Sequence, residues 1–515
     1  MTIRKLCEVY LVVASFSGVT HATTVKAPKV INRDVIVIGG GAAGSHAAFR
    51  LQQDYNKTVV LIEKEAILGG HVDTYLDTTT TTAGGPPIPR EYGVAVYFPY
   101  LDSLDFITRR FPNLTLSPGL GPRGATITRY IDFSTGLPLP SNYTSGGPDP
   151  SLITTAIIRF HDLMVSKGWD KMVEPGFWNL PPGPLIPDDL LLPIGEFAKK
   201  WNVTEALPRM YESTGGGPAA RHKRFEDLMT LTFLQSFSPA WMKVFFGEAG
   251  MYHIEGGNQQ LYDAFQEGLG EGNVLTRSVV ASVRRPEKEG DKRGIEVIVR
   301  TTSGGKATTT VVRAKKILIA IPPTRENLAP FDLNAYETDL FSRPKYGRYG
   351  TAIVTAPVLP RGYELHNTPL LAATDPNKPF INEPHILEFS SYGNDSALFS
   401  IGTSGSGLSY GEFDEKQAIK VAQESLDRMV AAGTVKVAEG GKKSDAKLQV
   451  LEYSDHGPGG FGVTTEEMRG GWMERMYGLQ GKRGTWYTGN AIAIDFSTQL
   501  WKMNDEVLRR MVESW

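Results

Sequence analysis

A glycine-rich turn directly after a short β-branched run constrains the fold of this chain more than any other feature. Residues 35–38 read Val-Ile-Val-Ile, which is typical of a buried parallel strand, and the glycines follow at once. Gly39 permits a tight turn, Gly41 lets a pyrophosphate approach the backbone, and Gly44 lets the next helix pack close to the strand. The helix predicted over residues 42–53 offers free N–H groups and its positive dipole end to phosphate. The pattern predicts a nucleotide-binding strand–turn–helix unit.

An acidic residue supports this interpretation. Residues 59–62 predict a second buried strand, and Glu63 ends it, about 20 residues after the last glycine, where a ribose-binding carboxylate belongs. A glycine fingerprint alone also occurs in loops of unrelated α/β proteins. With both strands, the helix and the acid in place, it indicates a dinucleotide, without choosing between NAD and FAD.

Length and charge set further bounds. The 515 residues are enough for two or three domains, or for one interleaved pair. The net charge of −2 gives no indication of a nucleic-acid partner.

The N-terminal segment, residues 1–22, resembles a secretory signal. Arg4 and Lys5 precede an apolar run at 11–19, and small residues at the correct offsets place a cleavage site after Ala22. The run is too short to span a bilayer, so no stable membrane anchor is expected. The alternative is a disordered N-terminal tail. Cleavage would remove the single cysteine, leaving no disulfides and no thiol nucleophile.

Five Asn-X-Ser/Thr sequons fit a secreted glycoprotein, although a chain of this length carries some by chance. They begin at Asn56, Asn113, Asn142, Asn202 and Asn394.

The rest of the chain alternates between strand-like and helix-like patterns, with no internal repeat. We predict strands over 92–97, 274–283, 295–301 and 315–321, helices over 152–167, 192–201, 260–269 and 500–511, and a mixed sheet within 331–450. An aromatic and methionine-rich stretch, 225–247, reads as helical. It forms core packing or lines an apolar substrate cavity.

Several of these segments, taken in order, resemble the flavin amine oxidase superfamily. They are the fingerprint with Glu63, Gly69-Gly70, Ile254-Glu255-Gly256-Gly257 with its helix, Ala320-Ile321-Pro322-Pro323 and Tyr487-Thr488-Gly489. The resemblance implies FAD rather than NAD. It implies an α/β fold in which a discontinuous Rossmann-type FAD-binding domain (33–100, 251–330 and 451–515) carries an inserted mixed α+β substrate domain (101–250 and 331–450).

Within the superfamily, the chain is most similar to fungal secreted flavoproteins of the β-cyclopiazonate dehydrogenase type. The segments at 69–75 and 91–96 carry this likeness. Algal polyenoic fatty acid isomerases look similar in the same places.

The resemblance implies a set of cofactor-binding residues. Some of them would bind the pyrophosphate, the adenosine ribose and the adenine. Others would lie under the isoalloxazine ring or place a helix N-terminus at the flavin's pyrimidine carbonyl. The set is Gly39, Gly41, Ala43, Gly44, Glu63, Lys64, Gly69, Gly70, His71, Val94, Ala95, Val280, Gly489, Asn490, Thr498, Gln499 and Leu500.

Four positions depart from the superfamily's usual pattern. Glu65 and His71 stand where arginines are usual, and Ala491 stands where an acid is usual. The lysine that hydrogen-bonds a water at flavin N5 in the oxidases falls near Leu328. The first three departures alter how the cofactor is held. The fourth argues against simple amine oxidation.

His71 has three interpretations. A neutral imidazole can attack the activated methyl of the flavin, and the cyclopiazonate-type relatives imply such a histidyl link. His71 could instead hydrogen-bond FAD without a covalent link, or serve in packing only. His253 and Glu255 lack further ligands nearby, so no metal site is predicted. Catalytic acid/base residues are not identifiable, although Trp501 and Tyr392 are candidate pocket aromatics.

These features together predict a secreted FAD-dependent oxidoreductase of secondary metabolism. It would dehydrogenate an apolar or aromatic small molecule by hydride transfer to flavin N5, with oxidative ring closure in the cyclopiazonate-like version. One alternative is a double-bond isomerase of polyunsaturated fatty acids without net redox change. Another is a non-catalytic flavin-binding protein. The oligomeric state is not indicated.

Overall fold

The computed structural model describes residues 28–81, 85–144, 149–213, 224–234, 236–287, 293–375, 380–382, 384–405, 413–493 and 496–515. The predicted secretory signal at 1–22 lies outside the described residues.

A five-stranded sheet, parallel throughout, forms the centre of the nucleotide-binding part. Its spatial order is β10 (Val274–Leu275), β3 (Val59–Ile62), β2 (Val35–Ile38), β14 (Lys316–Ile319) and β21 (Thr485–Tyr487). β2, β3 and β14 are buried at every residue, as expected of parallel strands with both faces covered. The strands come from segments far apart in the chain, so this sheet is discontinuous in sequence.

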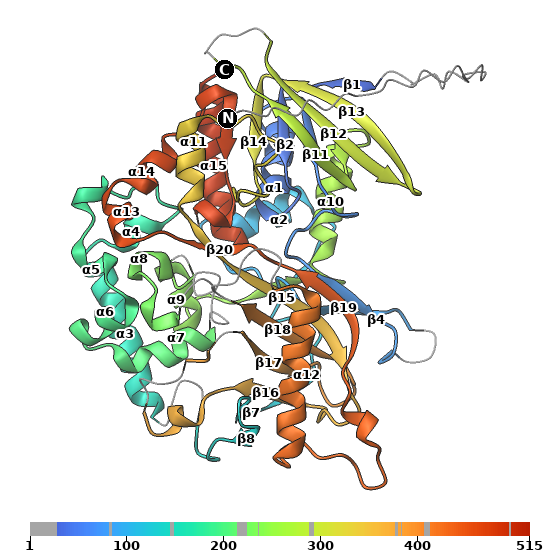
Figure 1. Cartoon of the computed structure of the whole chain (residues 1–515), viewed down its shortest axis with the longest axis vertical. Helices are drawn as coiled ribbons and strands as arrows, with labels where there is room; N and C mark the ends of the chain where they lie inside the picture. The colour runs from blue at the N-terminus through green and yellow to red at the C-terminus, as the bar shows by residue number, and fades with distance from the viewer. Residues whose placement is uncertain are drawn as a thin grey trace, which may run out of the picture.

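Helices and a second sheet cover the central sheet. α1 (Ala42–Gln53) follows β2 and packs against α10 (Gln259–Leu269) and α15 (Ser497–Glu513) (Figure 1). A four-stranded sheet, in the order β1 (Lys29–Asn32), β13 (Lys306–Ala314), β12 (Ile295–Ser303) and β11 (Ser278–Arg284), contacts it through β13 and β11. The predicted Rossmann-type α/β fold is confirmed.

A large mixed sheet forms the other end of the molecule (Figure 1). Its order is β19 (Gln449–Asp455), β15 (Lys345–Thr355), β18 (Phe399–Gly405), β17 (His385–Ser391), β16 (Tyr363–Asn367), β7 (Ile127–Asp132) and β8 (Leu137–Pro138), and β20 (Gly459–Gly462) pairs with β15. The amphipathic helix α12 (Glu415–Ala431) buries Ala422, Leu426 and Met429 in a core shared with this sheet.

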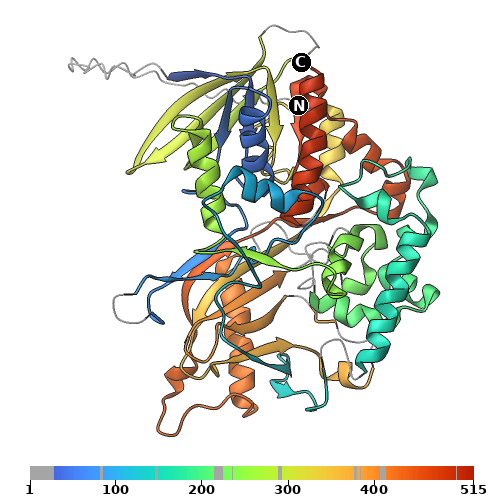
Figure 2. The same cartoon turned by 180° about the vertical axis from the view of Figure 1, so that it is seen from behind.

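A helical lobe lies beside both sheets, as Figure 2 shows from behind. It contains α3 (Pro150–Ser166), α4 (Asp170–Val173), α5 (Asp188–Leu191), α6 (Ile194–Trp201), α7 (Leu207–Ser213), α8 (Thr230–Phe233) and α9 (Pro239–Phe245). The shorter elements are β4 (Thr74–Asp77) with β5 (Ile88–Glu91), β6 (Leu116–Pro118) with β9 (Tyr252–Ile254), α2 (Ser103–Arg110), α11 (Ala335–Ser342), α13 (Thr465–Arg469) and α14 (Trp472–Tyr477).

Three element predictions need correction. The strand predicted at 92–97 is wrong: β5 ends at Glu91, and an irregular segment follows. The single helix predicted within 225–247 is divided, because Ser238 caps a new helix whose first residue is Pro239. The strand predicted over 274–283 is two strands, β10 and β11, separated by Arg277 in a left-handed conformation (φ +49°).

Candidate functional site

A cavity of about 750 Å³ opens at the carboxyl ends of β2, β3 and β14, where open parallel sheets bind their ligands. Thirteen of the residues expected to bind a cofactor line it. They are Gly39, Gly41, Ala43, Glu63, Lys64, Gly69, Gly70, His71, Val94, Val280, Gly489, Asn490 and Leu500. The structure therefore brings together residues that are spread over most of the chain.

Glycine is required at several positions of the turn by close approaches of the backbone. A Cβ on Gly44 would lie 1.8 Å from the carbonyl oxygen of Gly39, so α1 could not pack as it does. Gly39 has φ +99°, a conformation that L side chains rarely adopt. Gly41 and Gly70 face each other, and a Cβ on Gly70 would lie 2.8 Å from the Gly41 Cα. Two loops thus meet backbone to backbone along the cavity wall.

Glu63 joins two of these loops. Its carboxylate accepts hydrogen bonds from the Gly40 N–H (2.6 Å) and from the Glu65 N–H (2.8 Å). The side chain is buried but still lines the cavity. Charge-assisted bonds to backbone N–H groups hold this carboxylate in one orientation.

Four expected residues do not line the cavity. Gly44 packs α1 against the turn, and Ala95 lies beside the lining residue Val94. Thr498 and Gln499 are buried in the first turn of α15: the Thr498 carbonyl accepts a bond from Ser103 Oγ, and Gln499 Nε2 donates to Glu174 and to Ser238.

The sequence also missed parts of the lining. Asp73, Tyr262, Glu326 and Asn327 line the cavity, as do residues within 453–458, at the end of β19 and in the segment that follows it. No motif marks that segment, and its position depends on the pairing of β19 with β15 in the large sheet. Only the fold could reveal it.

The remaining sequence candidates lie elsewhere. Trp501 stacks on His46 and donates from Nε1 to the Ala42 carbonyl, and Tyr392 donates to the Glu91 carbonyl. Both are buried, and neither lines the 750 Å³ cavity. Burial also holds the pKa of His46 well below its usual value.

The aromatic stretch at 225–247 packs in the core. Phe233 and Phe237 are buried and stacked, and Trp241 stacks on Phe496 just before α15. None of its described residues lines the 750 Å³ cavity. Leu328, near which the sequence places the oxidase lysine, is likewise buried and outside the lining. Lys64 is the only lysine among the described lining residues.

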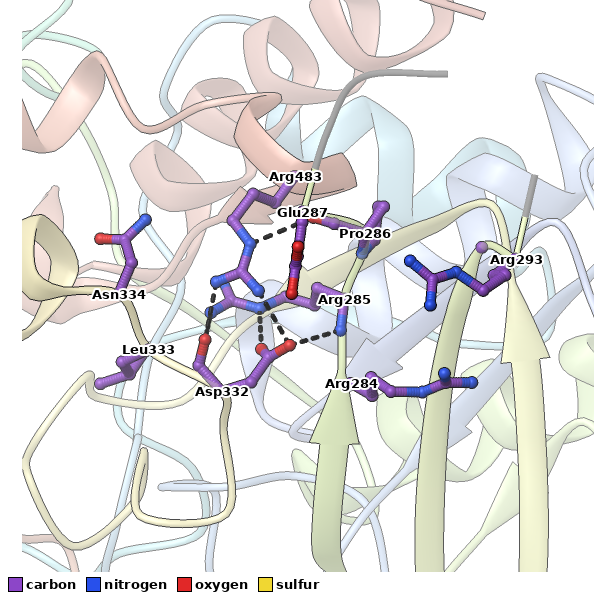
Figure 3. A pocket seen from close by; sticks show the side chains of 10 residues that line it. Arg284, Arg285, Pro286, Glu287, Arg293, Asp332, Leu333, Asn334 and Arg483 are labelled. Atoms are coloured by element: carbon purple, nitrogen blue, oxygen red, sulfur yellow. Dashed lines mark hydrogen bonds and ion pairs between the residues drawn. The ribbon is translucent and has the colours of Figure 1, made fainter. Parts of the chain in front are cut away.

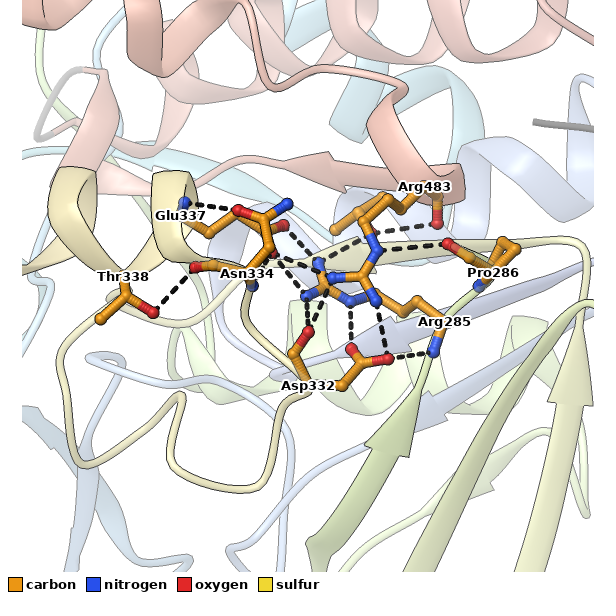
Figure 4. Close-up of polar contacts among 8 residues, drawn as sticks. Arg285, Pro286, Asp332, Asn334, Glu337, Thr338 and Arg483 are labelled. Carbon is orange, nitrogen blue, oxygen red and sulfur yellow. Dashed lines mark hydrogen bonds and ion pairs between the residues drawn. The ribbon is translucent and has the colours of Figure 1, made fainter. Parts of the chain in front are cut away.

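A second cavity, of about 560 Å³, is rich in arginine but is a less suitable candidate (Figure 3). Arg285 is fully buried and pairs with Asp332 and Glu337, each at 2.7 Å. Arg483 pairs with the same two carboxylates, at 2.8 and 3.1 Å (Figure 4). Two guanidinium groups and two carboxylates therefore neutralise one another, and the network joins β11, α11 and the turn before β21.

A buried carboxyl group lies behind the cavity wall. Glu91 accepts hydrogen bonds from the Asn258 N–H (2.8 Å) and from Thr74 Oγ1 (2.9 Å), while Asn258 Nδ2 donates to the carbonyl of the lining residue Val94. Burial, only partly offset by these bonds, raises the pKa of Glu91 from 4.5 to about 7.

Replacing Glu91 with glutamine should therefore change how stability depends on pH. Between pH 4.5 and about 7 the folded protein holds a proton at Glu91 that the unfolded chain has lost, so the stability contributed by this group falls as pH rises. Glutamine does not ionise, so Glu91→Gln avoids this loss. The free energy of unfolding of the variant minus that of the parent protein should therefore rise by about 3 kcal/mol between pH 4 and pH 8. Denaturant unfolding of the flavin-loaded proteins across this range measures the difference. The exposed variant Glu439→Gln should show no such trend, and parallel curves for Glu91→Gln and the parent would contradict the prediction.

The described residues contain neither a membrane-spanning helix nor a cluster of potential metal ligands. Within that part of the chain, no helix is both long and apolar enough to cross a membrane. The same residues contain no group of three or more His, Cys, Asp or Glu side chains placed to hold a metal ion.

Comparison with known proteins adds independent information. Residues 37–109 match the NAD(P)-binding Rossmann-like domain, and residues 203–436 match the flavin containing amine oxidoreductase family. The chain is 30% identical over 507 residues to the β-cyclopiazonate dehydrogenase of Aspergillus oryzae, covering 98% of both chains. It is 28% identical over 495 residues to an FAD-dependent oxidoreductase of Cochliobolus heterostrophus, covering 94% of this chain and 92% of the relative.

Solved structures show the same fold at low identity. A fatty acid isomerase from P. acnes that produces CLA superposes with a TM-score of 0.66 at 16% identity, covering 93% of this chain and 98% of that one. Putrescine oxidase superposes with a TM-score of 0.59 at 15% identity, covering 94% and 100%.

Proposed function

Because this chain belongs to the flavin containing amine oxidoreductase family and is an FAD-dependent oxidoreductase, we propose that it dehydrogenates an apolar or aromatic small molecule. The observation that carries the proposal is the cavity at the carboxyl ends of the parallel strands, with its glycine-lined wall. We propose the division stated above, with the FAD-binding domain at 33–100, 251–330 and 451–515 and the substrate domain at 101–250 and 331–450.

The residues of this cavity fit FAD. Where Gly41 and Gly70 meet, the wall carries no side chain, so a pyrophosphate can approach backbone N–H groups. Glu63 is already held by two N–H donors at the edge of the lining, which suits a ribose-binding carboxylate. In the first turn of α15, Ser497 and Leu500 line the cavity. These groups would hold the pyrophosphate, the ribose and the flavin ring respectively.

FAD, when bound, supplies a hydride acceptor at flavin N5 for a substrate C–H bond. The chain's own contribution is orientation and electrostatics. The N-terminus of α15 would stabilise negative charge on the flavin through the helix dipole. In the cyclopiazonate-like version, a second part of the same substrate closes a ring on the oxidised carbon.

His71 is proposed to contact the flavin, since it lines the cavity beside Gly70. A hydrogen bond and a covalent histidyl link make different predictions. After acid denaturation, a hydrogen-bonded flavin separates with the supernatant, whereas a linked flavin stays with the precipitated chain. If a link exists, His71→Ala should release the yellow colour into the supernatant, and the surface variant His161→Ala should not.

The structural likeness to a fatty acid isomerase favours one alternative function, that of a double-bond isomerase without net redox change. Anaerobic mixing with apolar aromatic compounds and with polyunsaturated fatty acids separates the possibilities. A dehydrogenase bleaches the flavin absorption and yields a product lighter by two hydrogens. An isomerase yields a product of unchanged mass, and a non-catalytic flavin-binding protein yields no product from any compound.

Secretion and glycosylation are proposed as well. The asparagines of all five sequons are exposed, which supports their modification. Recovery from culture medium of a chain that begins at Thr23 and loses mass on deglycosylation would support both. Retention in the cell with an intact N-terminus would contradict secretion.

A further inference from the structure

Three side chains from two distant segments of the chain meet at the cavity wall. His71 and Asp73 line the cavity, as do Asp455 and Gly457 on either side of His456. The His71 and His456 rings are stacked, with centroids 4.5 Å apart and planes inclined by 12°. His456 Nε2 lies 2.5 Å from Asp73 Oδ2. The buried His456 is thus held at its edge by a carboxylate and at its face by another imidazole.

The backbone fixes each member of this group. The Val94 N–H donates to the His71 carbonyl (2.8 Å) and the Tyr92 N–H donates to the Asp73 carbonyl (3.0 Å). A Cβ on Gly93 would lie 2.7 Å from Asp73 Oδ2, so the absence of a side chain there makes room for the carboxylate. On the opposite side, the His456 N–H donates to the Tyr349 carbonyl (2.9 Å) of β15.

This arrangement restricts the His71 ring. The carboxylate of Asp73 fixes the orientation of the His456 ring, because a short bond to Nε2 leaves little freedom about the last side-chain torsion. Stacking then fixes the plane of His71. Both ring nitrogens lie in that plane, so fixing it also fixes the directions in which they can donate or accept.

We propose that Asp73 and His456 are positioning residues that orient His71 toward the flavin. This rests on the proposed function, in which His71 contacts the flavin of bound FAD. The pair acts through His71, as residues that hold a ligand-binding side chain in place usually do. It keeps the contact between His71 and the flavin within the narrow range of geometries that binding sites need. It also explains why Asp73 pairs with the buried His456 at this wall, although no sequence motif marks the pair.

The visible absorption spectrum of bound FAD tests the proposal whether or not the flavin is covalently held. We expect His456→Ala to shift the spectrum in the same direction as His71→Ala and by at least half as much. Asp73→Asn should produce a smaller shift in the same direction, and His456→Phe, which keeps a ring for stacking, should retain most of the parent spectrum. The double variant His71→Ala/His456→Ala should match His71→Ala alone, because His456 acts through His71.

One control variant and two possible contrary results test whether Asp73 and His456 position His71. His253→Ala, a histidine of β9 that bonds the Gly119 carbonyl outside the cavity lining, should leave the spectrum unchanged. If His71→Ala alters the spectrum and neither His456→Ala nor Asp73→Asn does, the positioning role is wrong and the His71 contact stands. If His71→Ala itself leaves the spectrum of bound FAD unchanged, both are wrong. Should His456→Ala not fold, the near-isosteric Asp73→Asn decides.

Discussion

Gly44→Ala should yield a chain that neither folds stably nor retains flavin, whereas Gly41→Ala should yield a folded protein that binds flavin more weakly. The reason lies in what each new methyl group meets. On Gly44 it would lie 1.8 Å from the Gly39 carbonyl oxygen, an atom of the backbone that cannot move aside without breaking the turn. On Gly41 the nearest atom is the Gly70 Cα at 3.5 Å, an ordinary contact.

The two variants therefore separate loss of fold from loss of cofactor. Overpacking a core typically costs about 1–3 kcal/mol, and a clash with fixed backbone costs more, so Gly44→Ala should lower the unfolding midpoint sharply. Gly41 lines the cavity, so its new methyl group occupies the space that the pyrophosphate needs and should weaken FAD binding by at least about tenfold, or 1.4 kcal/mol.

Flavin absorbance per mole of protein and the thermal unfolding midpoint of the apoprotein measure the two effects independently. The control is Ala47→Gly, one turn further along the same helix. It should lose about 0.5–1 kcal/mol of stability through helix propensity, and a little more through the loss of a buried methyl group, but it should still bind FAD. A yellow, stable Gly44→Ala protein would show that α1 does not pack closely against the Gly39 turn.

Sequence patterns best predicted those parts of the fold that are specified by residues close together in the chain. The turn at 39–44 and Glu63 form one strand–turn–helix–strand unit, and short-range chemistry specifies it almost completely. The strand predicted at 92–97 failed for a related reason. Its run of valine and tyrosine residues suggested a strand, but the backbone N–H groups of Tyr92 and Val94 donate to carbonyl groups of the loop at 71–73 instead.

The cavity wall formed by Asp73 and His456 could not be predicted in this way. The two residues are 383 positions apart, and their contact exists only because β19 pairs with β15 and brings the following segment to the nucleotide-binding sheet. Neither residue has a neighbour pattern that indicates its partner. Sequence patterns thus located the glycines that line the cavity, but not the contact between Asp73 and His456.

Arg285→Met should strongly destabilise the protein, although Arg285 lies outside the lining of the 750 Å³ cavity. Its guanidinium is fully buried and bonds both Asp332 and Glu337, and its loss leaves two carboxylates to share Arg483. Removing one partner of a buried ion pair typically costs about 3–5 kcal/mol, because the remaining charge stays desolvated. Denaturant unfolding should therefore show a large drop in midpoint. The flavin spectrum should be unchanged under native conditions, since the network shares no residue with the cofactor cavity.

Restoring the charge balance should recover part of this loss. In Arg285→Met/Glu337→Gln, Asp332 and Arg483 remain as one matched pair, and the glutamine oxygen can still accept the Asn334 N–H that Glu337 accepts at 3.0 Å. The double variant should therefore be more stable than Arg285→Met alone, which is a strongly non-additive result for residues in contact. The neighbouring Arg284→Met, whose side chain is exposed and 3.7 Å from Glu296, should change stability by no more than about 0.5 kcal/mol. A double variant as unstable as the sum of its two single changes would mean that the geometry of the network, rather than its neutrality, holds β11 to α11.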